Sequence, residues 1–396
     1  MSNMTWIVFK KEITDLFRDR KAFLSAVILP IFLLPVMMLI LGSSAASNTN
    51  VVKQGIRIAI VGEQNSSLEN VLKQDSNIQI IKTDNPEQSL QNEQIYLYLN
   101  VPQNFDANIK NKDGSAKVNI YFDNTSQKSQ IALAQIEGII NEYNEAEVGG
   151  RLKSLGVSES LLTPVSVNAI GVGIKSEKEA HALQLVAMLL PMFVLVYAAQ
   201  GGAAAATDLA AGEKERGSLE PLLSTSASRA SILMGKLMAI TVMGILSTLS
   251  GFIGLIVSMI VPNSLLMTEG GIVLQPEAIV IIAILAILIT LSFSALQLAI
   301  SVYAKSFKEA QTYLGFLTFA PMIISYGTMY MDASGMGAFL YNIPILNAVL
   351  VMKEAIFGIY DPMHLILTFV WSVIYIILAL VLARYMFNRE EALFRS

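Results

Sequence analysis

The sequence of 396 residues contains no cysteine and only two histidines, His181 and His364. The lack of cysteine excludes disulfide bonds, thiolate metal sites and cysteine nucleophiles, although it does not by itself indicate a compartment. With two histidines, a histidine-based metal site or a Ser-His-Asp triad is not expected either. Charge is also scarce: 15% of the residues are charged, the net charge is -4, and no basic stripe indicates a nucleic-acid partner.

The motifs of common nucleotide-binding and hydrolytic sites are missing as well. There is no G-x-x-x-x-G-K-[ST] phosphate loop, because Gly235-Lys236 lacks the upstream glycine. H-E-x-x-H and G-x-S-x-G are also absent, which argues against an intramembrane enzyme. We therefore expect a chain that is not an enzyme and binds no cofactor or metal. If the chain does work, another polypeptide binds the nucleotide.

Long apolar segments are what the sequence does have. Hydrophobic residues make up 54% of the chain and the mean hydropathy is +0.55. A helix needs roughly 20 apolar residues to cross the hydrocarbon core of a bilayer. The pattern predicts an α-helical membrane protein with six transmembrane helices, at residues 22–42, 183–206, 232–261, 278–303, 313–331 and 365–387.

Residues 1–21 precede the first apolar segment and read as an amphipathic helix. Its apolar side chains share one helical face: Trp6, Phe9, Ile13, Leu16 and Phe17. A helix of this kind lies in the membrane interface against lipid, although an ordinary surface helix would show the same pattern. Residues 43–47 faintly resemble a signal cleavage site, but the apolar run is too long for a signal core, so we expect an uncleaved span.

Residues 43–180 have the composition of a soluble domain. Four runs read as strands: Gly55–Val61, Ile78–Ile81, Gln94–Leu99 and Lys117–Phe122. One long helix is expected over Ser129–Leu155. The segment is long enough to build its own core, so we predict a large α/β domain between the first two spans.

The distribution of Lys and Arg predicts the orientation of the chain. Basic residues cluster before the first span and in the loops that six spans would leave on the same side, whereas the short loop at 262–276 has none. Because cytoplasmic loops carry the excess of Lys and Arg, both termini should be cytoplasmic, including the tail at 388–396. Residues 43–180 should then be extracellular, in a multi-pass protein of the cell membrane.

Residues 332–364 are moderately apolar but too short and interrupted to span twice. We expect an extracellular loop with two short re-entrant helices broken near Pro344, shielded from lipid by protein. A plain surface loop is the alternative.

Residues 207–231 are a charged segment between two apolar segments. We expect them to form a cytoplasmic loop at the membrane surface. Helical propensity extends to Leu219, with Gly212 and Gly217 as weak points and Pro221 as a stop. A short helix held there could transmit a push from a soluble partner to the spans on either side. A merely solvated loop is the alternative.

Polar residues inside or beside the spans are candidates for a translocation path. Thr290, Ser294, Gln297 and Ser301 recur at helical spacing and share one face. They could join helices by hydrogen bonds or line a path for a cargo or a cation. The full set of candidates is Gln200, Asp208, Thr290, Ser294, Gln297, Ser301, Asn347 and Glu354.

Three stretches carry a resemblance to a known family: Glu213–Leu223, Val101–Phe105 with Asn119–Asn124, and Asn342–Asn347. With the order of spans and domain, they make the whole chain similar to the type-2 ABC exporter permeases, and within them to sodium-extrusion permeases. The resemblance implies a homodimer driven by a separate ATPase subunit that binds ATP and Mg²⁺. It also implies a coupling helix whose ATPase-docking residues are Glu213, Lys214, Glu215, Arg216, Ser218 and Glu220.

Sodium is the cargo that this resemblance favours, since oxygen atoms of carbonyls, Ser and Thr can coordinate a hard cation. Related permeases carry drugs, lipids or peptides, and these remain alternatives. An alternative of another class is a membrane-anchored receptor or scaffold that binds a ligand with residues 43–180. Five further spans and a charged inner loop argue against it, because one span would suffice as an anchor.

Overall fold

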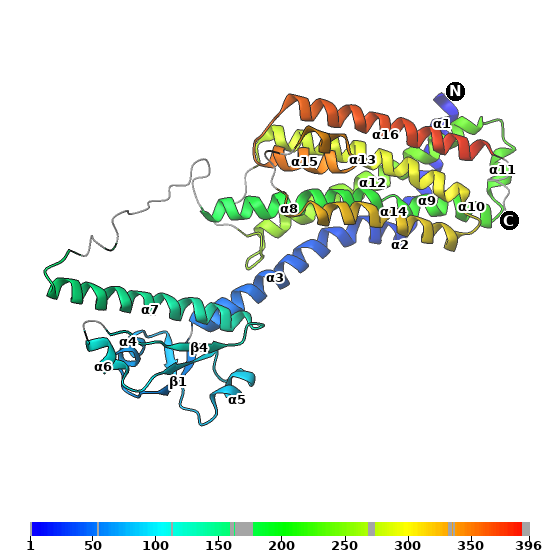
Figure 1. Ribbon diagram of the computed structural model, residues 1–396. Coiled ribbons are helices and arrows are strands. Elements are labelled where there is room, and N and C mark those ends of the chain that lie inside the picture. Colours follow the sequence, from blue (N-terminus) through cyan, green and yellow to red (C-terminus); the bar gives the residue numbers. More distant parts are fainter. Residues whose placement is uncertain are drawn as a thin grey trace. The chain divides into compact units, whose positions relative to one another are not determined.

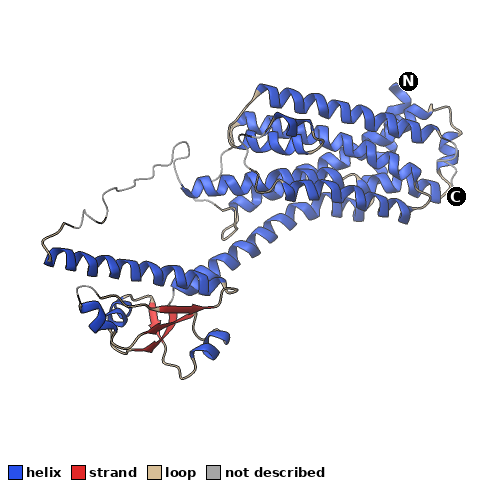
Figure 2. Ribbon diagram, in the orientation of Figure 1, coloured by secondary structure: helices blue, strands red, loops and turns tan. Residues whose placement is uncertain are grey.

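The computed structural model describes residues 2–53, 55–111, 114–158, 162, 177–267, 274–331, 335 and 337–389. The chain divides into two compact units, one made of residues 1–41 and 171–396 and the other of residues 42–170. The first unit is a bundle of helices and the second contains the β-sheet (Figures 1 and 2). Most of the predicted tail at 388–396 lies outside the described residues, as do residues 332–334 of the predicted extracellular loop.

Within the described residues, five helical segments are long and apolar enough to cross a membrane: Arg20–Ser44, Ala182–Glu215, Arg229–Ile260, Pro276–Tyr303 and Pro362–Asn388. The last three are α12, α13 and α16. α14 (Phe307–Gly327) covers most of the predicted span at 313–331 but is not among the five, because polar residues dilute it. A count of six spans therefore remains a prediction.

The first predicted span is longer than the sequence indicated. α1 (Ser2–Arg18) is followed by α2 (Arg20–Phe23), a π-helical turn (Leu24–Ile28) and α3 (Leu29–Lys53). The Asp19 side chain caps α2 by accepting from the backbone N–H groups of Lys21 and Ala22. α3 runs on to residue 53, beyond the predicted end of the span at residue 42, although the two compact units divide between residues 41 and 42.

The second span also continues further than predicted. α8 (Glu177–Gln200), α9 (Ala203–Ala206), a π-helical stretch (Thr207–Gly212) and α10 (Glu213–Glu215) follow one another with only a short turn at residues 201–202. The helix then ends at Gly217, whose φ of 69° suits glycine. The stop expected at Pro221 is wrong: Pro221 lies inside α11 (Leu219–Leu223), where the first turn of a helix tolerates proline.

The bundle packs through small residues where helices approach closely. α12 contacts α8, α13 and α1, and α13 also contacts α16, α8 and α15 (Leu346–Ile356). A Cβ at Gly244 of α12 would lie 2.6 Å from Cγ2 of Thr290 on α13. A Cβ at Gly254 would lie 2.7 Å from the Pro30 carbonyl oxygen. These glycines allow backbones to approach as small residues do in membrane bundles.

The segment before α16 contains a 3₁₀ turn (Ala338–Asn342) and α15, separated by Ile343 to Ile345. Every residue of α15 from Asn347 to Ile356 is buried. The φ of Ile345 is 69°, a conformation that a β-branched residue rarely adopts. Protein therefore surrounds α15 on all sides.

The second unit is a small α/β domain with its own core. Its strands are β1 (Ile56–Gly62), β2 (Ile78–Ile80), β3 (Leu97–Val101) and β4 (Asn119–Phe122), in the order β2-β1-β3-β4. β1 pairs in parallel with β2 and β3, and β4 pairs antiparallel with β3. The helices are α4 (Ser67–Gln74), α5 (Pro86–Gln91), α6 (Phe105–Lys110) and α7 (Gln127–Ser154). α7 packs on β3, β4 and α4, and the strands contribute buried Ile58, Leu97 and Leu99.

A polar network fastens α6 to α4 and α7 in this domain. Ser67 donates to Oδ1 of Asp106 through its backbone N–H at 2.9 Å and its hydroxyl at 2.7 Å, and its oxygen lies 2.7 Å from the Tyr143 hydroxyl. Burial raises the pKa of Asp106, but the hydrogen bonds from Ser67 outweigh it and hold the pKa below its ordinary value.

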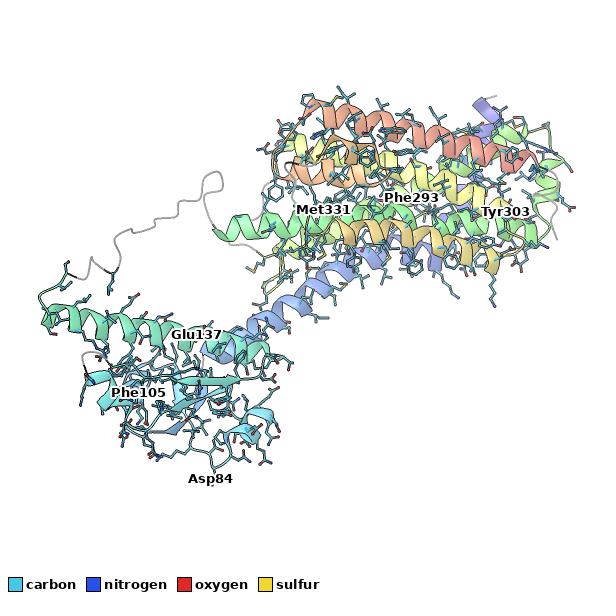
Figure 3. The ribbon with its side chains drawn as sticks, in the orientation of Figure 1. Asp84, Phe105, Glu137, Phe293, Tyr303 and Met331 are labelled. Carbon is cyan, nitrogen blue, oxygen red and sulfur yellow. The ribbon has the colours of Figure 1, made fainter. Side chains whose placement is uncertain are left out.

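This network predicts an acid-sensitive domain. A carboxyl whose pKa is lowered by folding stabilises the fold at neutral pH, and this contribution is lost as the pH falls below about 4 and through the lower folded-state pKa. For residues 55–158, urea midpoints should fall on acidification, and Asp106→Asn should remove about 1 kcal/mol at pH 7 and flatten the profile. Asp84→Asn, on an exposed loop (Figure 3), is the matched control. An unchanged profile in Asp106→Asn would exclude this role.

Candidate functional site

The N-terminal helix packs against α12 through a face that the apolar pattern indicated only in part. Val8, Glu12 and Leu16, spaced four residues apart, are buried, whereas Trp6 and Phe17 are about half exposed. Gly235 permits the approach, because a Cβ there would lie 2.6 Å from Cγ1 of Val8. The predicted apolar face overlaps this contact in part, because Leu16 is buried and Phe9 and Ile13 pack against the same core. Trp6 and Phe17 remain on the outside of α1.

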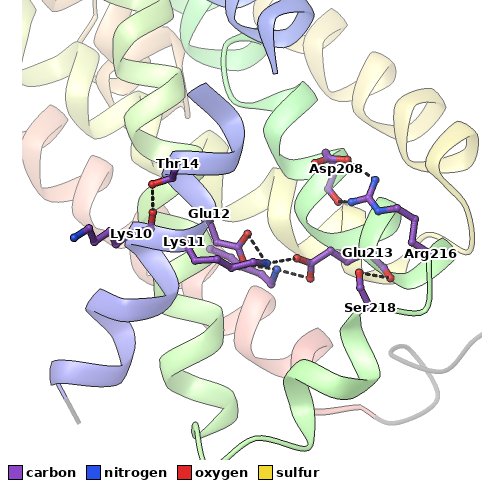
Figure 4. Close-up of polar contacts among 9 residues, drawn as sticks. Lys10, Lys11, Glu12, Thr14, Asp208, Glu213, Arg216 and Ser218 are labelled. Atoms are coloured by element: carbon purple, nitrogen blue, oxygen red, sulfur yellow. Dashed lines mark hydrogen bonds and ion pairs between the residues drawn. The ribbon is translucent and has the colours of Figure 1, made fainter. Parts of the chain in front are cut away.

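Four charged side chains form a closed ring at this contact (Figure 4). Lys236 Nζ of α12 lies 2.9 Å from Glu12 Oε1 and 2.6 Å from Glu213 Oε2. Lys11 Nζ lies 3.2 Å from Glu12 Oε2 and 3.0 Å from Glu213 Oε1. We call these four residues the ion-pair ring. It joins three segments that are far apart in the sequence: α1, α10 and α12.

Three of the four side chains of the ion-pair ring are buried, and its formal charges balance. Lys236 is 0% exposed, Glu12 is 1% exposed and Glu213 is 5% exposed. Burial lowers the pKa of Lys11, but the carboxylates of Glu12 and Glu213 outweigh burial and raise it above its ordinary value. Two cations and two anions in alternation give each buried charge two opposite neighbours, which is the arrangement that a low-dielectric site requires.

The residues that follow Glu213 bind two further helices. Lys214 Nζ donates to the carbonyl oxygens of Val302 at 2.8 Å and Ala304 at 2.9 Å, at the end of α13. Glu215 Oε2 accepts from the backbone N–H of Phe307, at the start of α14. Three consecutive side chains therefore connect the loop to α1, α12, α13 and α14.

These contacts change the interpretation of the six predicted docking residues. Glu213, Lys214 and Glu215 use their charged groups inside the chain. Arg216 pairs with the predicted path residue Asp208 at 2.8 Å, and Ser218 is bonded to the Glu213 carbonyl. Arg216, Ser218 and Glu220 are exposed, as is most of the stretch from Gly217 to Ser226. A partner would meet α11 and its flanks rather than Glu213.

The polar face of α13 is buried, with no more than 1% exposure at any of its four residues. Thr290 Oγ1 donates to the Ala286 carbonyl at 2.7 Å. Among the described residues, Ser294 Oγ, Gln297 Oε1 and Ser301 Oγ are buried atoms that have no hydrogen-bond partner. Buried polar atoms nearly always have partners, so three unpaired oxygens on one helical face require an explanation.

Gln297 reaches the point where the second span is interrupted. Its Nε2 donates to the Ala199 carbonyl at 2.6 Å, next to the turn between α8 and α9. A Cβ at Gly202 would lie 2.5 Å from Gln297 Oε1. Only glycine therefore leaves room for this oxygen. In many transporters the cation is bound by backbone carbonyls and helix ends where a span is interrupted, as the second span is here.

The other predicted path residues lie in different surroundings. Gln200 is exposed. The buried Glu354 accepts from the Tyr341 hydroxyl at 2.6 Å and lies 2.9 Å from His364 Nδ1, with the two rings stacked. The adjacent Lys353 binds carbonyl oxygens beyond α14, including that of Met331 (Figure 3). Glu354 and Lys353 thus fasten α15 to its neighbours and are not directed to the polar face of α13. Asn347 lines a separate cavity.

Comparison with known proteins identifies the family to which this chain belongs. Residues 21–385 match the profile of the family described as ABC-2 family transporter protein. The chain belongs to the ABC-2 transporter family. It is therefore a permease and a multi-pass membrane protein, and permeases of this family imply an ATPase partner and are generally not enzymes themselves.

The permease is also similar to a curated relative over nearly its whole length. It is 29% identical over 387 residues to the ABC transporter permease protein NatB of Bacillus subtilis (strain 168). The match covers 97% of this chain and 98% of the relative.

Sequence patterns did not single out Glu12, although it completes the ion-pair ring. The available signal was Lys236, a lone charge in an apolar segment that needed a partner.

Proposed function

We propose that this permease is the transmembrane subunit of an ATP-driven exporter whose separate ATPase docks on Arg216–Ser226. One observation carries the proposal: Glu213, Lys214 and Glu215 connect the loop to four helices. A force applied at α11 would be transmitted through these side-chain contacts to α1, α12, α13 and α14, with no flexible linker between them. ATP and Mg²⁺ would be bound by the partner.

The proposed cycle uses these connections. Closure of two ATPase subunits would push α11 and, through Lys214, the end of α13. Gln297 lies on the same helix, one to two turns before the carbonyls that Lys214 binds. The push would therefore move Gln297 relative to the interruption at Ala199, and the bundle would alternate between inward-open and outward-open states.

The assembly follows from the same scheme. α14 would be the sixth span, both termini would be cytoplasmic, and the sheet domain would be extracellular. α1 would lie in the membrane interface with Trp6 and Phe17 toward lipid, which agrees with their exposure. Two copies of the permease would form a homodimer above two ATPase subunits. The excess of basic residues near the proposed inner ends supports this orientation.

Sodium is the cargo that we favour. The unpaired oxygens of Ser294, Gln297 and Ser301 are acceptors of the kind that bind hard cations. They share one buried face, and no proton donor is needed to satisfy them if a cation passes. Drugs, lipids or peptides are the alternative cargo classes. A receptor or scaffold fits less well, because it would not need the loop connections.

The first test is ATP-dependent uptake of radioactive sodium into inside-out vesicles that contain the permease and its co-encoded ATPase. We expect uptake, and we expect Glu220→Lys on the exposed face of α11 to reduce it at least about tenfold by weakening docking, equivalent to ~1.4 kcal/mol. Lys308→Glu, an exposed charge on α14, is the matched control.

The outcomes separate the two parts of the proposal. Coupled ATP hydrolysis without sodium uptake would leave the exporter assignment and remove sodium as the cargo. Normal uptake and normal co-purification of the ATPase with Glu220→Lys would show that α11 is not the docking surface.

A further inference from the structure

A cavity of about 330 Å³ lies among α13, α14, α15 and α16. Its lining is mainly apolar, with Phe293 (Figure 3), Leu317 and Leu378 among the contributors. The volume falls in the range of small-molecule sites, which are about 300–1,000 Å³ and apolar with few polar groups. The cavity is separate from the polar face of α13 described above, because none of the four residues of that face lines it.

Asn347 supplies a polar group with a defined direction in this cavity. It is 1% exposed, and its Oδ1 accepts from the backbone N–H of Ala348 at 2.8 Å. Because an N–H group donates to that atom, it must be the oxygen, and the amide NH₂ is the free end. Among the described residues, Nδ2 is a buried atom without a hydrogen-bond partner. The cavity therefore contains an unsatisfied donor.

The neighbouring polar groups are one further hydroxyl donor and two hydroxyl oxygens that accept. The Tyr375 hydroxyl is buried and has no hydrogen bond of ordinary geometry within the described chain, but a weaker side-chain hydrogen bond from Asn347 reaches it. Ser292 and Ser372 direct their hydrogens to the carbonyls of Leu288 and Thr368. Among the described residues that line the cavity, none is Lys, Arg or His. An uncharged oxygen acceptor would satisfy the donors of Asn347 and Tyr375. A buried cation would find no carboxylate among the described lining residues, and an unpaired carboxylate would be too costly to bury.

The lining also indicates how an occupant enters. Leu378 is 60% exposed and Leu382 is 38% exposed, and both contribute to the cavity wall on α16. The rim is thus apolar and belongs to a helix that crosses the membrane. An apolar chain could enter from the bilayer without crossing water. Ile345, held at positive φ, also lines the cavity, and strain of this kind is concentrated at ligand sites.

We propose that this cavity binds a membrane amphiphile that has one apolar chain and an uncharged carbonyl oxygen, such as an ester. The chain lies between α13 and α16, and the carbonyl accepts from the Asn347 amide and the Tyr375 hydroxyl. The occupant is either a free single-chain ester or one acyl chain of a bilayer lipid. The site is independent of the sodium path and of the docking surface, so it stands whichever cargo the exporter carries.

The test uses the full-length permease in nanodiscs and two photoactivatable probes, a diazirine-bearing monoacylglycerol and a diazirine-bearing phosphatidylglycerol. Labelling, mapped by mass spectrometry, is expected on peptides from α13 and α16. Labelling by the first probe alone would indicate a free amphiphile, and labelling by the phospholipid would indicate a bilayer lipid. Asn347→Leu, which removes the donor at similar volume, should reduce labelling several-fold.

Two further variants keep the test decisive. Ala320→Phe fills the cavity from α14 and should abolish labelling even if Asn347→Leu folds poorly. Thr368→Val removes another buried and unpaired hydroxyl of α16 that does not line the cavity, so it should label normally. Absence of labelling in the wild-type chain would overturn the proposal. So would labelling that Asn347→Leu leaves unchanged and that an alkane of equal length displaces as well as the ester does.

Discussion

Replacing Lys236 with methionine is expected to destabilise the permease by about 3–5 kcal/mol, the cost of removing one partner from a buried ion pair. The variant would leave the buried carboxylates of Glu12 and Glu213 facing each other, with only the half-exposed Lys11 between them. Thermal unfolding of the purified chain should show a large fall in the midpoint. Transport should be lost as well, because α10 would no longer be held to α12.

A compensating substitution distinguishes charge balance from packing. Lys236→Met combined with Glu213→Gln restores neutrality, since one lysine then faces one carboxylate, and it should recover much of the lost stability. Thr241→Val is the control on α12, because the Thr241 hydroxyl donates only to its own helix. If Lys236→Met unfolded at the wild-type temperature, the ion-pair ring would have no structural role.

Replacing Gln297 with leucine is expected to reduce sodium uptake at least about tenfold, or ~1.4 kcal/mol in the transport barrier, while the ATPase still binds. The substitution removes an unpaired buried oxygen and the hydrogen bond to the Ala199 carbonyl. Loss of a ligand oxygen weakens a hard-cation site, and loss of the bond lets the interrupted helix close. Uptake in inside-out vesicles and ATP hydrolysis should be measured on the same preparation.

The comparison of those two rates is the informative result. Hydrolysis that continues without sodium uptake places Gln297 on the cargo path rather than in assembly. Ser258→Ala, a buried hydroxyl of α12 whose hydrogen goes to the Gly254 carbonyl, is the control and should transport normally. Wild-type uptake in Gln297→Leu would remove the polar face of α13 from the path and leave it as contact between helices.

The sequence predicted those parts of the fold that depend on periodicity. The apolar segments overlap the long helices, and the four predicted strands overlap β1 to β4, because hydrophobic spacing alone determines both. The ends of the helices could not be predicted as well from the sequence. Polar residues after Ala206 did not end the second span, since Glu213 and Lys214 find partners on α12 and α13 that lie far away in the sequence.

The candidate site could be predicted only in part for the same reason: its residues meet partners that are far away in the sequence. Lys236 was visible as a lone charge, but its two partners are more than 20 residues away and on separate segments, 224 residues away for Glu12. Glu12 also interrupts the side of α1 that is buried, so the apolar stripe overlapped that side only in part, at Leu16. The Asn347 amide was noticed as polar, but only the surrounding cavity reveals that it is an unpaired donor.

The order of the ion-pair ring along the chain has a consequence for biosynthesis. A lysine at the centre of an inserting helix costs about 3 kcal/mol by insertion scales, and the cost is smaller near the start of the helix, where Lys236 lies. Both carboxylates that pair with Lys236 precede it in the sequence, at positions 12 and 213. They have therefore left the ribosome before α12 is complete, together with Lys11. Lys236 can meet its counter-charges as its helix enters the bilayer, so α12 need not wait there with an uncompensated charge.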